Sequence, residues 1–203
     1  MHDWPQLLGL LIAVACLSTL ADSLSTGSLI AIDTRLANSI DTWRGGAFDW
    51  PMLALTNFGG WGMTTLAVLS MAVLWAAHER RHALLVFLVC GGAMLVNLLL
   101  KFAVDRPRPD MALVYLISGT RFASFPSGHT MGAMATLGGL MVVTQRLGAP
   151  LWALLLGWLF AGLIVAGIAI SRIYLGAHFP SDVLAGLLAS TAWLLLVSGW
   201  LER

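Results

Sequence analysis

The sequence carries little charge. Only 10% of its 203 residues are Asp, Glu, Lys or Arg, whereas a soluble domain contains about 25%. This scarcity argues against a globular protein surrounded by water. The formal net charge is +1, so the sequence also lacks the clustered basic excess that nucleic-acid binding requires. We therefore expect no nucleic-acid partner.

Cysteine is nearly absent too. Cys16 and Cys90 both lie inside apolar runs, where no other side chain suggests a metal site. Free cysteine behaves as a small apolar residue. We predict that both cysteines are buried small hydrophobes.

Apolar residues are abundant, at 59% of the chain. A helix needs about 20 apolar residues to cross a bilayer, and six stretches approach this length: 6–24, 61–77, 83–104, 128–145, 150–171 and 180–200. The first has no basic residue before it, so it is interpreted as a retained helix rather than a signal peptide. The sequence predicts an all-α polytopic membrane protein, a six-helix transmembrane bundle in one domain over residues 1–203.

The longest segment between two spans is predicted to lie in the membrane interface. Its apolar residues recur at helical spacing, with polar residues between them, which is typical of an interfacial helix: Leu29, Ile30, Ile32, Leu36, Ile40 and Trp43. Gly45-Gly46 ends this pattern. A second short helix is expected before Gly59-Gly60, so that the interfacial segment covers about residues 29–58.

Six spans would place both termini on one side of the membrane. The loops at 25–60, 105–127 and 172–179 would then lie on the other side. Several basic residues of those loops belong to the motifs below. Without them, the sequence Glu79-Arg80-Arg81 favours a cytoplasmic side for the termini.

The first candidate motif follows the third apolar stretch and reads Lys101-Phe-Ala-Val-Asp-Arg-Pro-Arg108-Pro109. The prolines require an extended exit from the helix. An arginine fork and a lysine point charge together suit a phosphate group. Basic residues just outside a span are also common anchors to lipid headgroups, so this motif alone is weak.

The second motif, Phe125-Pro126-Ser127-Gly128-His129, directly precedes the fourth span. A helix start with small residues exposes backbone N–H groups that bind anions. Ser127 adds a hydroxyl, Gly128 permits close approach of a ligand, and His129 is placed to donate a proton. An ordinary helix start with an interfacial histidine is the alternative.

The third motif runs from Ser171-Arg172 to His178 and Asp182. Arg172 is a further anion ligand. Because His178 and Asp182 are four residues apart at the start of the sixth span, they are expected to share a helix face. The carboxylate would then fix the imidazole tautomer and leave the other nitrogen nucleophilic. A purely structural His–Asp pair is the alternative.

Together the three motifs place cations, two histidines and a carboxylate on one membrane face. Ionisable groups at this depth are costly and mark functional sites. Phosphoryl transfer needs this set, namely positive groups around the phosphoryl oxygens, a nucleophile and a proton donor.

The motifs resemble the signature K-x6-R-P, P-S-G-H and S-R-x5-H-x3-D of the type 2 phosphatidic acid phosphatase superfamily, over about residues 50–190. Every signature position is occupied: Lys101, Arg108 and Pro109; Pro126, Ser127, Gly128 and His129; Ser171, Arg172, His178 and Asp182. The signature's spacing selects Arg108 rather than Arg106, whose role stays open, with contact to the lipid headgroup as one option. The role of Arg121 is also open.

The resemblance implies a catalytic set of His178, His129 and Asp182. His178 would be the nucleophile, Asp182 would orient it, and His129 would protonate the leaving group. A phosphohistidine would then be hydrolysed by water. The phosphate would be bound by the remaining polar positions, Lys101, Arg108, Ser127, Gly128 and Arg172. The family needs no metal and no cofactor.

The resemblance also implies a phosphorylated membrane lipid as substrate. Undecaprenyl diphosphate and phosphatidylglycerophosphate are favoured, and phosphatidic acid and lipid A stay open. The expected location is a bacterial inner membrane, with the active site on the extracytoplasmic side; no motif indicates an obligate protein partner. A vanadate-dependent haloperoxidase, the superfamily's other chemistry, is disfavoured because known members are soluble. A non-enzymatic anion transporter or channel is the remaining alternative, although few polar residues such as Asn97 lie within the spans.

Overall fold

The computed structural model describes residues 4–109 and 123–201, and these residues form helices and connecting loops without a strand. Chain order gives α1 (Trp4–Ser25), α2 (Ile30–Asp41), α3 (Asp49–Asn57), the π-helix η1 (Phe58–Gly62), α4 (Met63–Ala76), α5 (Arg80–Val104), α6 (Gly128–Arg146), α7 (Leu151–Tyr174) and α8 (Pro180–Trp200). The predicted all-α class is confirmed.

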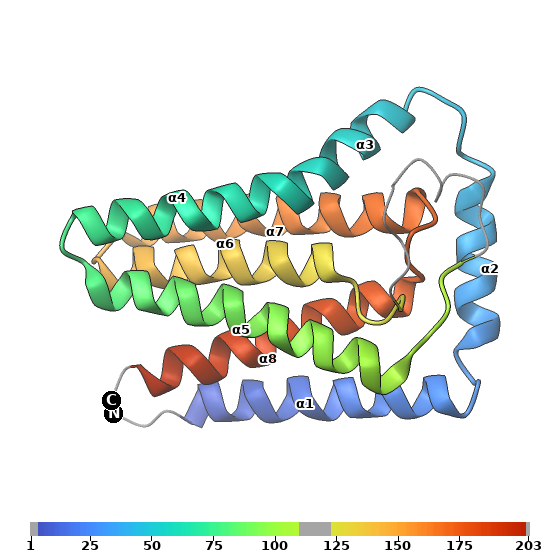
Figure 1. Cartoon of the computed structure of the whole chain (residues 1–203), viewed down its shortest axis with the longest axis horizontal. Coiled ribbons are helices and arrows are strands. Elements are labelled where there is room, and N and C mark those ends of the chain that lie inside the picture. Colours follow the sequence, from blue (N-terminus) through green and yellow to red (C-terminus); the bar gives the residue numbers. More distant parts are fainter. Residues whose placement is uncertain (1–3, 110–122, 202–203) are drawn as a thin grey trace.

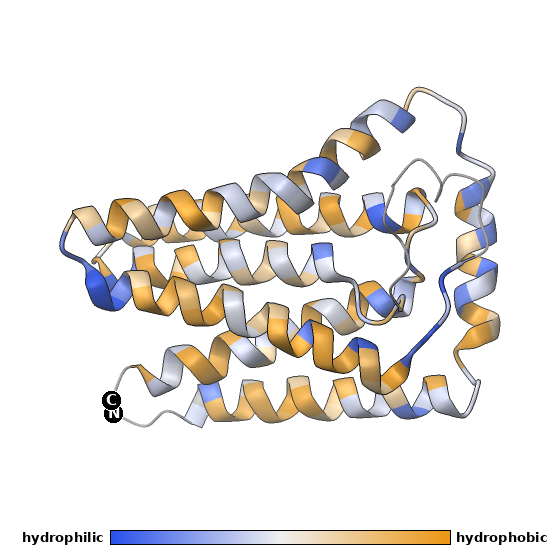
Figure 2. Ribbon diagram, in the orientation of Figure 1, coloured by the Kyte–Doolittle hydropathy of each residue, from blue (hydrophilic) through white to orange (hydrophobic). Residues whose placement is uncertain are grey.

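The long helices lie alongside one another, and α2 crosses one end of the bundle (Figure 1). The beginning of α1 and the end of α8 lie at the opposite end (Figure 1). Apolar residues dominate the bundle, whereas hydrophilic residues gather at its two ends and on α2 (Figure 2). This banding is expected of a protein whose central part faces hydrocarbon.

Five helices of the described chain are long and apolar enough to cross a membrane: Gln6–Ser25, Asp49–Ala76, Arg80–Val104, Leu151–Tyr174 and Pro180–Trp200. The predicted count of six spans is not confirmed, because α6 is long enough, at 19 residues, but less apolar. It packs against α4, α5, α7 and α8. Its neighbours are therefore largely protein, where small residues allow close helix packing.

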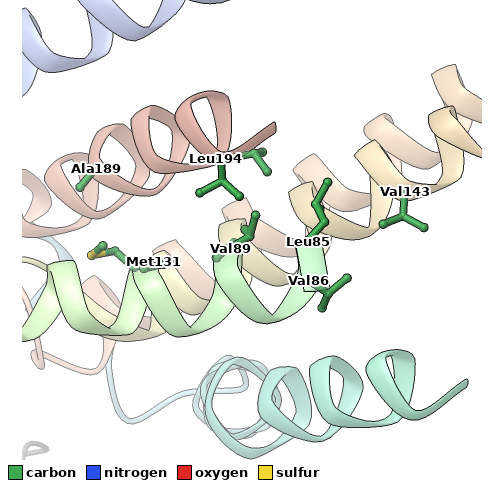
Figure 3. Packing of buried hydrophobic residues seen from close by; sticks show 10 residues of the cluster. Leu85, Val86, Val89, Met131, Val143, Ala189 and Leu194 are labelled. Atoms are coloured by element: carbon green, nitrogen blue, oxygen red, sulfur yellow. The ribbon is translucent and has the colours of Figure 1, made fainter. Parts of the chain in front are cut away.

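The core between α5, α6 and α8 is built from interlocking aliphatic side chains (Figure 3). Val89 of α5 and Met131 of α6 are almost fully buried, and Leu194 of α8 is 4% exposed. This packing fixes the relative positions of the helices that carry Lys101, His129 and Asp182.

One local prediction was incomplete and another was wrong. The short helix expected before Gly59-Gly60 is present as α3, but it continues through η1 into α4 as one run, Asp49–Ala76. A Cβ at Gly59 would lie 2.5 Å from Cγ2 of Ile168, so this glycine serves close packing against α7 instead. Cys16 is exposed on α1 rather than buried, and Cys90 is partly buried.

Candidate active site

All three motifs meet at the end of the bundle that α2 crosses. The C-terminal ends of α5 and α7 and the N-terminal ends of α6 and α8 lie together there (Figure 1). The N–H of Ser127 donates to the carbonyl oxygen of Asp182 at 2.9 Å, and that of Ser124 to the carbonyl oxygen of Arg106 at 2.7 Å. These backbone bonds join segments that are far apart in the sequence.

His178 occupies the centre of the site and is 2% exposed. Its Nε2 lies 3.5 Å from NH1 of Arg108, and its Nδ1 lies 3.7 Å from Oδ2 of Asp182. Burial lowers the pKa of His178 to about 4, because a charged imidazole would lose its hydration. The ring is therefore neutral at neutral pH, with one nitrogen free of a proton.

His178 and Asp182 do not share a helix face as predicted. α8 begins at Pro180, so His178 lies in the preceding loop. Proline is favoured in the first turn of a helix because its missing N–H would be unpaired there. Asp182, at the third helical position, turns back to accept from the N–H of Phe179 at 2.8 Å.

Ser124 lies beside the imidazole and the carboxylate and contacts both. Its hydroxyl donates to Oδ2 of Asp182 at 2.5 Å and lies 3.4 Å from Nδ1 of His178. Both Ser124 and Asp182 are fully buried. The serine therefore helps to hold the carboxylate beside the ring.

Arg108, Lys101 and Arg172 form a cluster of cations, and Arg108 lies next to Nε2 of His178. Arg108 donates to the carbonyl oxygen of Ala177 at 2.8 Å. This hydrogen bond holds the guanidinium next to the imidazole of His178. Lys101 donates to the carbonyl oxygens of Ala123 at 2.5 Å and Pro126 at 3.1 Å. An ammonium has three donors, so one is left for a ligand.

Arg172 is the third cation and is 2% exposed. Its NH1 donates to the hydroxyl of Thr56, but its buried Nε has no hydrogen-bond partner among the described residues. A buried donor without a partner is costly. An oxyanion in the site would satisfy it.

The start of α6 supplies further donors. Ser127 is the N-cap residue, and no side chain caps this helix end, so the first-turn N–H groups are available to an anion. Thr130 donates to Oγ of Ser127 at 3.0 Å. A Cβ at Gly128 would lie 3.2 Å from Oδ1 of Asn97, so a larger residue there would require Asn97 to move by a few tenths of an ångström.

His129 follows Gly128 and faces the π-helix η1. A Cβ built on Gly60 would lie 3.0 Å from Nε2 of His129. A single π-helical turn frequently marks a functional site. Here it brings a bare backbone against the second histidine.

The structure thus brings together every residue predicted for the site. It also adds residues that the motifs did not indicate: Asp33, Thr56, Gly60, Arg106 as a ligand of Asp182, and Ser124. Most of these come from helices distant in sequence, so no local spacing could have revealed them. Arg121 lies outside the described residues.

A helical membrane bundle with an imidazole between a carboxylate and converging cations is the architecture of a membrane phosphatase. Residues 81–203 match the PAP2 superfamily, and the chain belongs to this superfamily. Phosphatidylglycerophosphatase B of Bacillus subtilis is 31% identical over 91% of this chain and 90% of its own length.

Two further comparisons agree. Undecaprenyl-diphosphatase BcrC of Bacillus subtilis is 30% identical over 62% of this chain and 61% of its own length. The crystal structure of a transmembrane PAP2 type phosphatidylglycerolphosphate phosphatase from Bacillus subtilis superimposes with a TM-score of 0.82 and 28% identity, covering 95% of this chain and 96% of that chain. The protein is a hydrolase of phosphate esters.

The contact between Gly60 and His129 gives a direct test. Gly60→Ala would push the imidazole of His129 by a few tenths of an ångström. A small misplacement of a reacting group lowers the reaction rate strongly. We expect kcat for para-nitrophenyl phosphate to fall about tenfold, with an unchanged unfolding temperature. Gly162→Ala is the control, because no atom lies within 4 Å of that position. Equal kcat values in Gly60→Ala and Gly162→Ala would show that the contact between Gly60 and His129 does not affect catalysis.

Proposed function

We propose that the chain is a single-domain integral membrane lipid phosphatase, over residues 1–203 with an interfacial segment at about 29–58. It removes a phosphate from a lipid phosphomonoester or diphosphate through a phosphohistidine on His178. The observation that supports this proposal most strongly is the buried, neutral imidazole of His178. Its Nε2 lies next to Arg108, and its Nδ1 lies next to Asp182.

In the first step Nε2 of His178 attacks the phosphorus atom and the bond from phosphorus to the lipid oxygen breaks. His129 gives its proton to that oxygen, so that the lipid leaves as an alcohol or a monophosphate. Asp182 stabilises the positive charge that develops on the His178 ring. The phosphoryl group is then covalently bound to His178.

In the second step a water molecule attacks the phosphohistidine. His129, now without its proton, accepts one from the water. The bond from Nε2 to phosphorus breaks and inorganic phosphate leaves. His178 returns to its neutral state, so the protons balance over one turnover.

The phosphoryl oxygens are bound by the side chains of Lys101, Arg108, Ser127 and Arg172 and by the backbone at Gly128. Two observations support this assignment. Nε of Arg172 has no partner within residues 4–109 and 123–201, and no described side chain caps the start of α6. These fixed positive groups supply the electrostatic stabilisation that metal ions provide in other phosphatases. We therefore propose that the reaction needs no metal.

A cavity of about 430 Å³ supports a lipid substrate. It begins at Gly128 and His129 and is lined largely by apolar residues of α4, α5 and α6, reaching Phe87 and Thr136. A phosphate bound near His129 would leave its apolar tail next to this cavity. The burial of apolar tail surface there contributes to binding.

Phosphatidylglycerophosphate and undecaprenyl diphosphate are the favoured substrates, because two of the relatives carry these activities in their names. Phosphatidic acid and the 1-phosphate of lipid A remain candidates, the second from the similar lipid A 1-phosphatases. We propose a bacterial inner membrane, with the site on the extracytoplasmic side. The Arg80–Trp75 pair at the opposite end is consistent with cytoplasmic termini.

Phosphate release by the purified protein tests the mechanism. We expect release from at least one of phosphatidylglycerophosphate, undecaprenyl diphosphate, phosphatidic acid and lipid A in detergent with excess EDTA. His178→Ala should lower the rate at least about a thousandfold, because the nucleophile is lost. Release that EDTA abolishes, or that survives in His178→Ala, would contradict the mechanism. Binding without release by the native protein would favour an anion transporter.

The cavity gives a separate test of the lipid assignment. Gly132 of α6 lines it, and no atom lies within 4 Å of a Cβ at this position. Gly132→Leu should fill part of the space and lower kcat/KM for dioleoyl phosphatidic acid about tenfold, since one lost side-chain-sized contact costs about 1–3 kcal/mol. Hydrolysis of para-nitrophenyl phosphate, which has no tail, should be unchanged.

Gly162→Leu on α7 is the matched control, because it lies in open space outside the cavity. An equal loss for the tailed and the tail-free substrate in Gly132→Leu would contradict the assignment of the cavity to the lipid tail.

A further inference from the structure

Arg106 lies between two carboxylates, those of Asp182 and Asp33. Its NH1 is 2.7 Å from Oδ1 of Asp182, and its NH2 is 2.8 Å from Oδ2 of Asp33. NH1 also donates to Oγ of Ser181 at 2.8 Å, and the guanidinium stacks on the ring of Phe179 at 4.2 Å. In all of these contacts Arg106 binds groups of the protein rather than a ligand.

Asp33 is the only charged residue of α2 that is buried, at 3% exposure, and most residues of that helix are exposed. Its carboxylate accepts from the N–H of Ser181 at 3.1 Å and from the hydroxyl of the same residue. A buried carboxylate is costly unless it is paired and hydrogen-bonded. The first turn of α8 and Arg106 together provide this pairing.

The two residues therefore connect α2 to the carboxylate that faces His178. Oδ2 of Asp182 lies 3.7 Å from Nδ1, which is longer than a hydrogen bond. A shift of a few tenths of an ångström decides whether that bond forms during the reaction. Without Asp33, the charge of Arg106 would act on Asp182 alone and weaken it as an acceptor for the imidazole N–H.

We propose that Asp33 and Arg106 are positioning residues for the reaction: Arg106 fixes Asp182 next to His178, and Asp33 holds both Arg106 and the first turn of α8 in place. The proposal rests on the roles of His178 and Asp182 in the proposed function. Neither residue contacts the phosphate ligands Lys101 or Arg172 in the described contacts. Loss of either one should reduce kcat and leave KM nearly unchanged.

The test compares Asp33→Asn with Asp49→Asn in the full chain, with phosphatidic acid in detergent micelles as substrate. Asp49 of α3 accepts from the hydroxyl of Tyr174 at 2.7 Å and from the N–H of Gly45 at 3.2 Å. It ties the same part of the chain to α7 without contacting Arg106, so it controls for general loosening of this region.

Asp33→Asn should lower kcat about 10- to 100-fold, as when a group that orients a functional ligand is lost, with KM within about twofold. Asp33→Glu should restore part of kcat, and Asp49→Asn should keep it. Arg106→Lys should resemble Asp33→Asn. The double variant should be no slower than the slower single variant, because both act through one contact.

The unfolding temperature of each variant in micelles separates positioning from folding. If Asp33→Asn does not fold, Ser181→Ala replaces it: this change removes a contact of Asp33 with α8 but keeps the charge, and should lower kcat with little change in KM. Wild-type kcat in the folded Asp33 variant, a rise in KM alone, or an equal loss in Asp49→Asn would overturn the proposal. Activity that survives in His178→Ala would instead overturn the proposed function.

Discussion

Ionisable groups at the end of an apolar bundle must be solvated by the protein itself, and the site is organised around this requirement. Lys101 is held by two carbonyl oxygens, and Arg106 by two carboxylates. Arg172 is held by Thr56, and its Nε–H has no partner in the part of the chain that the structure describes. On the Nδ1 side of His178, the protein provides acceptors for Arg106. Among the cations of the phosphate site, Arg172 lacks one acceptor within the described residues. A phosphate in the site would supply the missing acceptor.

The same requirement explains the shape of the surrounding helices. α6 carries the uncapped helix start and packs against α4, α5, α7 and α8, so its small residues and its large apolar residues such as Met131 face mostly protein. Gly59 and Gly60 let η1 approach Ile168 and His129. α2 lies across the open end and contributes Asp33 from a largely exposed helix.

Much of the site could be predicted because its residues sit in short motifs at span ends. Lys101, His129 and His178 are brought together by any bundle that aligns those ends. Asp33 could not be predicted. It is 73 positions from Arg106 and lies before the residues 81–203 that match the superfamily. No periodicity in α2 distinguishes it from the exposed acidic residues nearby.

The local geometry of His178 and Asp182 also could not be predicted from the sequence. The four-residue spacing of His178 and Asp182 suggested one helix face, but Pro180 starts the helix after His178. Ser124 lies beside the two side chains and contacts both. The expected count of six spans is not confirmed, because α6 is less apolar than the other long helices. Hydropathy does not reveal which helix is surrounded by its neighbours.

The covalent intermediate tests the central claim most directly. Native protein mixed with radiolabelled phosphatidic acid is quenched in alkali within one turnover, and the labelled peptide is identified by mass spectrometry. The account predicts phosphohistidine at His178, formed and lost at rates consistent with turnover. Label on another residue, or no labelled protein during rapid hydrolysis, would contradict it.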